Sequence, residues 1–461
     1  MQSGTNTRYA LANSGAPLDD AEVNEFANNE NSIDVLGLGC GPANLALATA
    51  IEDGHHESAL RAVFTERADT VEWQKNMLIP WSRSQTSFIK DLVTLRNPQS
   101  EFSFLNFLKA TGKLVEFANL GTLFPYRIEL SAYISWVAAR LDKVKVSTGH
   151  ECTSLQPVIE GGRVTEFEAS FSNGRRIRAA DVVVGIGRKP NIPTAFRDLP
   201  DDRCAHSSKF LSLVDAWKGR RGLRVAVVGA GQSAAEILLS IPEELPESRV
   251  TVIMRSLGFR NSETSKFLDE FYFPDFVDVF YGLPEVGRRL IADEIRHTNY
   301  AGVTPVMLEA LYSKIYLERL TNTAQHEISG GTEVIDTAVA DGNVRLQLRN
   351  MMTNKVSETH CDFVVLATGY EIGQPALLAD MGEFLIKDAA GQFLVNRNYR
   401  VETGPGVEAS IYLQSYSEAT HGITEGVLSI VSIRAQNVLQ EIFERRAVRH
   451  RRPADKMRVA N

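Results

Sequence analysis

The chain has 461 residues, of which 23% are charged and 44% are hydrophobic, an ordinary composition for a globular protein. The net charge of −8 argues against a nucleic-acid partner, and no apolar run reaches the roughly 18–20 residues of a membrane span. The four cysteines are far apart and form no C-x-x-C pair; they are Cys40, Cys152, Cys204 and Cys361. This spacing argues against a disulfide scaffold, a zinc site and a dithiol redox centre. We therefore expect buried thiols, no bound metal and a reducing cytoplasm.

The first readable unit follows a polar segment, residues 1–30, which lacks a secretory signal and is expected to be a mobile acidic tail. Residues 32–39 (SIDVLGLG) predict a strand, and residues 42–53 (PANLALATAIED) predict a helix with proline in its first turn. Residues 61–67 (RAVFTER) predict a second strand. Strand, glycine turn, helix and strand within this length indicate a βαβ unit.

The turn of this unit has the composition of a dinucleotide-binding loop. Gly37, Gly39 and Gly41 would let the backbone approach a pyrophosphate at the helix N-terminus. In a regular G-x-G-x-x-G the third glycine would stand where this chain has Pro42. Glu66 ends the second strand, where a carboxylate can accept hydrogen bonds from ribose hydroxyls.

The same pattern returns at residues 223–241 (LRVAVVGAGQSAAEILLSI) with regular G-x-G-x-x-A spacing at Gly229, Gly231 and Ala234. The following strand, SRVTVIMRS, ends near Arg255 rather than in an acid. An arginine in this place can pair with a 2′-phosphate, so the second turn favours NADPH over NADH. Two such turns in one chain are much stronger evidence for dinucleotide binding than one turn alone.

Two further strands end in glycine. Residues 181–190 (DVVVGIGRKP) and 361–370 (CDFVVLATGY) are β-branched, and the second runs into Thr368 and Gly369. In flavoenzymes with two dinucleotide domains, such strands pass the chain between the domains. We expect a split FAD domain with the NADPH domain inserted in it.

Three polar-aromatic stretches have no clean helix or strand period and are candidate walls of an active site. They are residues 73–109, residues 261–281 with 296–305, and residues 415–429. The C-terminal segment 446–461 is basic, and we expect it to be a mobile solvated tail.

The chain resembles the flavin-dependent monooxygenases that hydroxylate the side-chain amine of ornithine or lysine. The resemblance runs from about Ile33 to Gln440, and its markers in order are GLGCGPANLALA, SFIKDLVTLRNP, PYRIELSAYISW, VVGAGQSAAE, TNYAGV, ATGY and THGITEGVLS. In this family the first turn is similar to G-x-G-x-G-P, so Pro42 is a family variant of the fingerprint.

The resemblance implies an enzyme that uses FAD, NADPH and O₂. NADPH would reduce FAD, and the resulting C4a-hydroperoxide would transfer oxygen to a neutral primary amine while NADP⁺ shields it from water. An ammonium group with a pKa of about 10 must lose a proton first. No general base stands out, so the catalytic group is unknown.

The resemblance also implies residue roles. Trp73 and Gln85 would lie at the flavin, and Gln232, Ser233 and Arg255 at NADPH. The cofactor-binding prediction is completed by the turn residues: Gly37, Gly39, Gly41, Pro42, Glu66, Gly229, Gly231, Ala234, Thr368 and Gly369.

The predicted substrate site comprises Lys90, Asp269, Asn299 and Thr424. Lys90 matches the lysine that holds the substrate carboxylate, and Asn299 matches the asparagine at the amine end. Asp269 departs from the family, because the ornithine enzymes usually carry asparagine there. Two carboxylates near each other repel. Lys90 could therefore neutralise Asp269, and a carboxylate-free amine would suit the site.

We expect an α/β fold with two Rossmann-like domains, for FAD and NADPH, and a small, mostly helical substrate-binding region. The predicted FAD domain covers 31–217 and 362–445, the NADPH domain 218–257 and 301–361, and the substrate region 258–300. L-ornithine is the leading substrate, giving N5-hydroxyornithine for a hydroxamate siderophore or related product. A diamine such as putrescine or cadaverine, or L-lysine, is the alternative. Relatives suggest a homotetramer.

Other classes share parts of this pattern. Pyridine-nucleotide disulfide reductases need a cysteine pair that this chain lacks, and Baeyer–Villiger enzymes need a signature framed by glycine and tryptophan that is absent. A redox sensor would bind both nucleotides without forming a product. Hydroxylamine formation from a panel of amines separates these classes.

Overall fold

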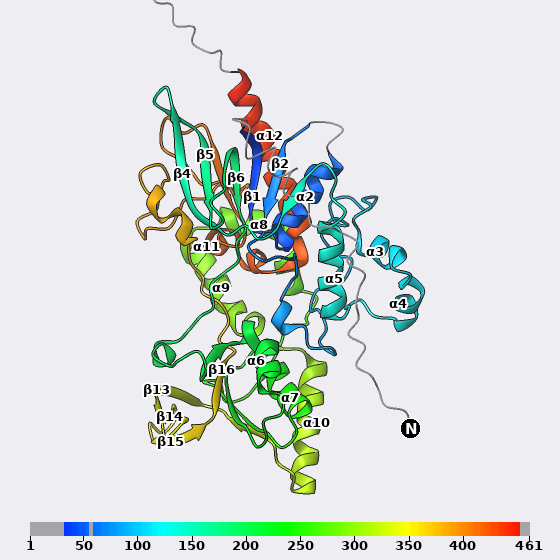
Figure 1. Cartoon of the computed structure of the whole chain (residues 1–461), viewed down its shortest axis with the longest axis vertical. Helices are drawn as coiled ribbons and strands as arrows, with labels where there is room; N and C mark the ends of the chain where they lie inside the picture. Colours follow the sequence, from blue (N-terminus) through cyan, green and yellow to red (C-terminus); the bar gives the residue numbers. More distant parts are fainter. Residues whose placement is uncertain (1–31, 55–58, 452–461) are drawn as a thin grey trace, which may run out of the picture.

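The computed structural model describes residues 32–54 and 59–451, which form two lobes (Figure 1). The predicted acidic tail at residues 1–30 lies outside the described residues. The upper lobe in Figure 1 holds a seven-stranded sheet in the order β3-β2-β1-β6-β5-β4, with β17 also paired to β6. Its strands are β1 (Ile33–Leu38), β2 (Ala62–Thr65), β3 (Lys145–Ser147), β4 (Cys152–Glu160), β5 (Arg163–Phe171), β6 (Arg176–Val184) and β17 (Ser410–Leu413).

The predicted first βαβ unit forms the centre of this sheet. β1 is flanked by β2 and β6, both parallel to it, and every residue of β2 is buried. The helix α2 (Pro42–Asp53) packs against β2 and against the long helix α12 (Val431–Arg451). Parallel strands covered on both faces are mostly apolar, which explains the hydrophobic character of β1 and β2 apart from Asp34 and Thr65.

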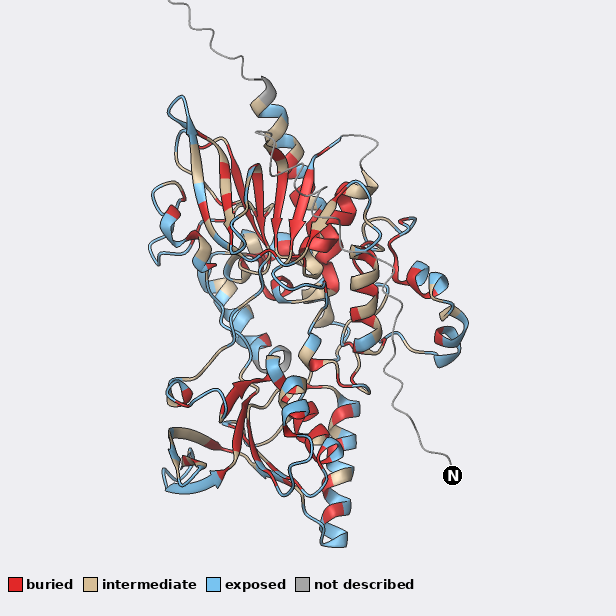
Figure 2. Ribbon diagram, viewed as in Figure 1, coloured by how far each residue is buried: buried red, intermediate tan, exposed pale blue. Residues whose placement is uncertain are grey.

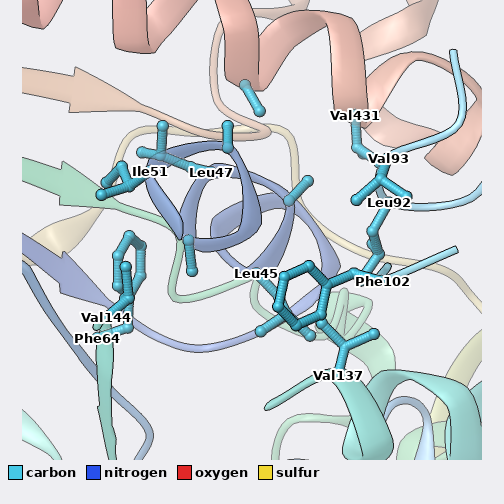
Figure 3. Close-up of a cluster of buried hydrophobic side chains, with 14 of the residues drawn as sticks. Leu45, Leu47, Ile51, Phe64, Leu92, Val93, Phe102, Val137, Val144 and Val431 are labelled. Atoms are coloured by element: carbon cyan, nitrogen blue, oxygen red, sulfur yellow. The ribbon is translucent and has the colours of Figure 1, made fainter. Parts of the chain in front are cut away.

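The core beside α2 is a cluster of large apolar side chains (Figure 3). Leu45, Leu47 and Ile51 of α2 are no more than 2% exposed. They lie among side chains from other elements, such as Phe64 of β2 and Val137 of α5 (Arg127–Ala138). Two short helices, α3 (Phe104–Ala110) and α4 (Leu114–Leu120), follow the irregular segment that begins at residue 73.

The lower lobe holds a five-stranded parallel sheet in the order β12-β9-β8-β16-β7. Its strands are β7 (Cys204–His206), β8 (Arg224–Val228), β9 (Arg249–Ile253), β12 (His326–Ser329) and β16 (Phe363–Leu366). Its helices are α6 (Phe210–Trp217), α7 (Gln232–Glu244) and α10 (Pro305–Thr321). A separate antiparallel sheet joins β13 (Thr332–Ala340), β14 (Asn343–Asn350) and β15 (Val356–Cys361).

These pairings correct the predicted domain boundaries. The prediction put residues 204–217 and β16 in the FAD domain, yet β7 and β16 both pair within the lower sheet. The error arose because a strand pattern does not show which sheet a strand joins. The chain enters the lower lobe before β7 and leaves it after β16.

Mostly helical segments lie between the lobes (Figure 1). β10 (Arg260–Asn261) and β11 (Gly302–Val303) pair with each other, so the two ends of the segment between them lie side by side. It contains η4 (Asp269–Tyr272), α8 (Pro274–Gly282) and α9 (Glu285–Asn299). It meets α11 (Glu418–His421) and η6 (Ile423–Gly426) of the late polar-aromatic stretch. The other 3₁₀ turns are η1 (Lys75–Met77), η2 (Thr194–Phe196), η3 (Ser207–Lys209), η5 (Ala376–Met381) and η7 (Leu428–Ile430).

The predicted basic tail is wrong for its first residues. Helix α12 continues to Arg451, and its last turns contact the upper sheet. Arg446 pairs with Asp34 at 2.9 Å, and Arg449 pairs with the buried Asp181 through Nη1 at 3.1 Å and through Nη2. The charge run is therefore partly structural, because its arginines neutralise acids of β1 and β6. The segment from residue 452 lies outside the described residues.

Burial is greatest in the parallel strands of the two large sheets (Figure 2), while the outer loops and most of the antiparallel sheet of β13, β14 and β15 are half-buried or exposed. All four cysteines are free thiols; Cys152 is half-buried and the others are buried. Within the described ranges, no helix has the length and apolar character needed to cross a bilayer.

Candidate active site between the lobes

The first glycine turn lies at the carboxyl ends of β1 and β2. A Cβ atom on Gly37 would lie 2.0 Å from the Phe64 ring. Gly39 has a φ of +83°, and a Cβ atom there would lie 2.5 Å from the Gly185 carbonyl oxygen. Gly41, directly before Pro42 of α2, is different, since a Cβ atom on it would meet nothing within 4 Å. The turn is thus tight against the sheet and open at the helix N-terminus, as a pyrophosphate site requires.

Two polar side chains fix this turn. The predicted ribose acid, Glu66, accepts a hydrogen bond from the Cys40 amide at 3.1 Å, which places its carboxylate beside the turn. Asn44 is fully buried and donates to the carbonyls of Leu38 at 3.0 Å and Gly39 at 2.8 Å. Asn44 was missed from the sequence, although an asparagine within an otherwise apolar helical turn is a detectable signal.

The second glycine turn is built in the same way. Gly229 has a φ of +147°, and a Cβ atom on it would lie 2.2 Å from the Ala367 carbonyl oxygen. Ala234 is fully buried where α7 packs on the sheet. Arg255 lies two residues beyond β9, is exposed, and forms no ion pair or side-chain hydrogen bond in the described ranges. Its guanidinium is free to meet a phosphate.

The first two residues of α7, Gln232 and Ser233, differ in whether their side chains already have hydrogen-bond partners. Gln232 donates to Glu236 at 3.0 Å and accepts a hydrogen bond from the Thr304 amide at 2.9 Å. Ser233 is half-buried, and its hydroxyl has no hydrogen-bond partner in the described part of the chain. A Cβ atom on Gly231 would meet only the Tyr300 carbonyl oxygen, at 3.3 Å. Gln232 thus positions the turn, while Ser233 is available to a ligand.

Thr368 and Gly369 lie on one of the two strands that connect the lobes. Asn191 on the other connection accepts a hydrogen bond from the Thr368 hydroxyl at 2.5 Å, and its amide donates to the Gly369 carbonyl at 3.0 Å. Pro190 and Tyr370 form an antiparallel bridge beside them. These residues hold the two connections together, and contact with a cofactor remains a prediction for them.

A buried ion pair joins the lobes. Arg127, the first residue of α5, donates from Nη2 to Glu236 Oε1 at 2.8 Å and from Nη1 to Oε2 at 3.0 Å. Their side chains are 9% and 1% exposed. Arg127 also donates to the Met77 carbonyl at 2.9 Å, in the irregular stretch that follows Trp73. Because Glu236 also binds Gln232, this pair connects the second turn to the upper lobe.

The irregular stretch itself spans both lobes. Its Met77 and Ile79 pack in the hydrophobic core of the lower lobe. Trp73 instead packs against the upper core, and its amide donates to the Ser131 hydroxyl at 3.1 Å. Gln85 is exposed and Lys90 is half-buried, and neither side chain has a hydrogen bond or ion pair in the described ranges. Lys90 is therefore a free cation.

The other predicted substrate residues lie on the helical segments. Asp269 begins η4, which packs against η6, the element that holds Thr424. Thr424 is 1% exposed and donates to the His421 carbonyl at 3.2 Å, so its hydroxyl is already used. Asn299 is the last residue of α9, and its side chain lies outside what the structure describes. Lys90 and Asp269 form no ion pair, so the expected neutralisation is absent from the described chain.

A second polar cluster, which sequence reasoning missed, lies beside these elements. Glu418 accepts hydrogen bonds from the Tyr300 hydroxyl at 2.5 Å and from Arg188 at 2.7 Å. Burial first, and then the Glu418 carboxylate, raise the pKa of Tyr300 well above its usual value. Tyr300 therefore stays a neutral donor that links the helical region to the late polar stretch.

Comparison with known proteins agrees with this geometry. A family model described as L-lysine 6-monooxygenase/L-ornithine 5-monooxygenase matches residues 31–372. The L-ornithine N(5)-oxygenase of Arthrobotrys oligospora is 36% identical over 445 residues, covering 92% of this chain and 91% of the relative. The L-ornithine N(5)-monooxygenase of Burkholderia cepacia is 37% identical over 406 residues, covering 85% and 90%.

A solved structure of the ornithine N-hydroxylase of Kutzneria sp. 744, described as holding reduced FAD, NADP⁺ and L-ornithine, has a TM-score of 0.86 at 32% identity. The match covers 90% of this chain and all of that chain, 100%. The predicted family and α/β fold class are confirmed, and so is the monooxygenase class. The chain belongs to the L-lysine 6-monooxygenase/L-ornithine 5-monooxygenase family.

Proposed function

We propose that this enzyme uses FAD, NADPH and O₂ to convert L-ornithine to N5-hydroxyornithine. The observation that carries the proposal is the pair of dinucleotide turns on two sheets, joined by the buried ion pair of Arg127 and Glu236. The names of relatives at 36–37% identity supply the substrate. They do not favour the diamine and lysine alternatives.

The residues present fit both nucleotides. The open space at Gly41 and the carboxylate of Glu66 suit the pyrophosphate and ribose of FAD. The free guanidinium of Arg255 suits the 2′-phosphate of NADPH. When bound and reduced, the flavin supplies the activation of O₂ that places an oxygen atom on the amine.

The protein's own groups would bind and orient the amino acid. Lys90 offers a free cation for the α-carboxylate, and Asn299 would hydrogen-bond the side-chain amine. Asp269 is half-buried with no cationic partner in the described ranges, so we assign it to the α-ammonium group. This arrangement resolves the apparent conflict of Asp269 with an amino-acid substrate, because ornithine carries one charge of each sign at its α-carbon.

The remaining predictions concern the cellular location, the pathway and the oligomeric state. The free cysteines of the described chain support a reducing cytoplasm. A role in hydroxamate siderophore synthesis and a homotetramer rest on the family resemblance alone.

An amine panel tests the proposal. The purified enzyme with FAD, NADPH and O₂ is given ornithine, lysine, putrescine and cadaverine in turn, and hydroxylamine is measured. We expect hydroxylated product with ornithine at the highest kcat/KM. NADPH consumption that yields only peroxide with every amine would contradict the proposal.

A Lys90→Met variant tests how the substrate is held. Loss of a charge-assisted hydrogen bond should raise the KM for ornithine about 10- to 150-fold. The KM for cadaverine, which has no carboxylate, should not change. Equal effects on both amines would remove Lys90 from carboxylate binding.

A further inference from the structure

An arginine-rich pocket lies at the outer end of the upper lobe. It has a volume of about 390 Å³ and is bounded by the start of β5, the segment 400–408 and the last turns of α12. The contacts of Arg446 with Asp34 and of Arg449 with Asp181, which is paired with Val35, place it toward the amino-terminal end of β1. The dinucleotide turn follows the carboxyl end of β1, so this pocket is separate from the candidate active site. Figure 1 shows α12 ending on the side away from the lower lobe.

Four arginines and two glutamates line the pocket, and two further acids, Glu441 and Asp181, pair with its arginines. Three of these arginines have acid partners. Arg163 pairs with Glu408 at 2.8 Å, and Arg400 pairs with Glu441 at 2.9 Å and with Glu402 at 3.3 Å. Arg449 pairs with Asp181.

Arg445 is the exception. In the described ranges it has no carboxylate partner; Nη2 reaches only the Glu408 carbonyl, at 3.5 Å, and the buried Nε has no acceptor. Burial and the guanidinium groups of Arg400 and Arg449 lower its pKa. A half-buried cation that forms no ion pair in the described ranges is costly, and the nearby Asp181 carboxylate, which pairs with Arg449, offsets this cost only in part.

We propose that this pocket binds a small doubly charged oxyanion, a phosphate group or a dicarboxylate, with Arg445 as its principal contact. Arginine presents a planar fork that matches the oxygens of both groups. The half-buried Thr403 also lines the pocket, and its hydroxyl, which has no hydrogen-bond partner in the described part of the chain, offers a neutral donor. A bound anion would supply the charge that Arg445 lacks and would tie the end of α12 to the segment 400–408.

Calorimetric titration of the holoenzyme tests the site. The enzyme is first saturated with FAD and NADP⁺, so that the dinucleotide sites cannot bind the probe. Inorganic phosphate and succinate are then titrated separately at matched ionic strength, with chloride as the blank. We expect one site per chain for at least one probe, and the probe that binds identifies the ligand group.

Two variants locate the binding. Arg445→Gln should weaken it at least about tenfold, and Thr403→Glu, which places a carboxylate in the pocket, should also abolish it. Arg319→Gln, on the exposed face of α10, is the matched control and should leave it unchanged. Binding of neither probe, or equal binding by Arg445→Gln and the parent enzyme, would overturn the proposal. Thermal melts without ligand confirm that each variant is folded.

Discussion

The buried pair of Arg127 and Glu236 should be the interaction on which the junction of the lobes depends most. A Glu236→Gln variant keeps the size of the side chain but leaves the Arg127 guanidinium, 9% exposed, with neutral acceptors such as the Met77 carbonyl and no carboxylate partner. Breaking one partner of a buried pair costs about 3–5 kcal/mol. We therefore expect Glu236→Gln to lower the free energy of unfolding by that amount and, because the unfolding entropy grows with chain length, to lower Tm by about 3–5 °C.

Denaturant unfolding of a double-mutant cycle measures this effect. Arg127→Met and Glu236→Met should each cost about as much as Glu236→Gln, and the double variant Arg127→Met/Glu236→Met should recover much of the loss, because no charge remains buried. The KM for NADPH should rise in Glu236→Gln, since the Gln232 amide and the Arg127 guanidinium must then compete for one amide oxygen.

The matched control is the exposed pair of Arg289 and Glu285 on α9, 2.6 Å apart, with side chains 72% and 75% exposed. Glu285→Gln should cost no more than about 0.5 kcal/mol. The reasoning is refuted if Glu236→Gln costs as little as this control, or if the two single effects at the buried pair simply add.

Four further predictions follow from other sites. Gly39→Ala places a side chain at a φ of +83° and against a carbonyl, so apoprotein stability should fall by more than the about 1–2 kcal/mol of backbone strain, measured by thermal melting. Gly41→Ala should instead leave apoprotein stability unchanged and weaken FAD binding in a flavin fluorescence titration; unchanged affinity would exclude the phosphate site there. Arg255→Ala should raise the KM for NADPH far more than that for NADH, and equal changes would count against a phosphate contact. Burial lowers the pKa of His421 in the folded protein, so in acid the unfolded chain binds a proton at this side chain more readily than the folded chain does. Stability should fall as pH drops below about 6.5, by up to about 1.4 kcal/mol per pH unit, and His421→Gln should flatten this slope in melts at several pH values.

The local elements could be predicted because each depends on neighbours in sequence. Apolar runs ending in glycine identified both dinucleotide turns, and Glu66 does lie beside the first one. The assignment of β7 and β16 to a sheet failed, since pairing over more than 130 residues leaves no local pattern. Arg127 and Glu236 each read as an ordinary charged residue of an amphipathic helix, and only the docking of the lobes brings them together.

The pairing of Asp181 with Arg449 has a consequence for synthesis on the ribosome. The acid is among the first 200 residues to emerge, and its partner is 268 residues later. Throughout most of translation, β6 also lacks β17, and α2 lacks the helix that covers it. The upper lobe therefore cannot complete its fold until nearly the whole polypeptide has been made. Until then it has an exposed strand edge and an unpaired carboxylate.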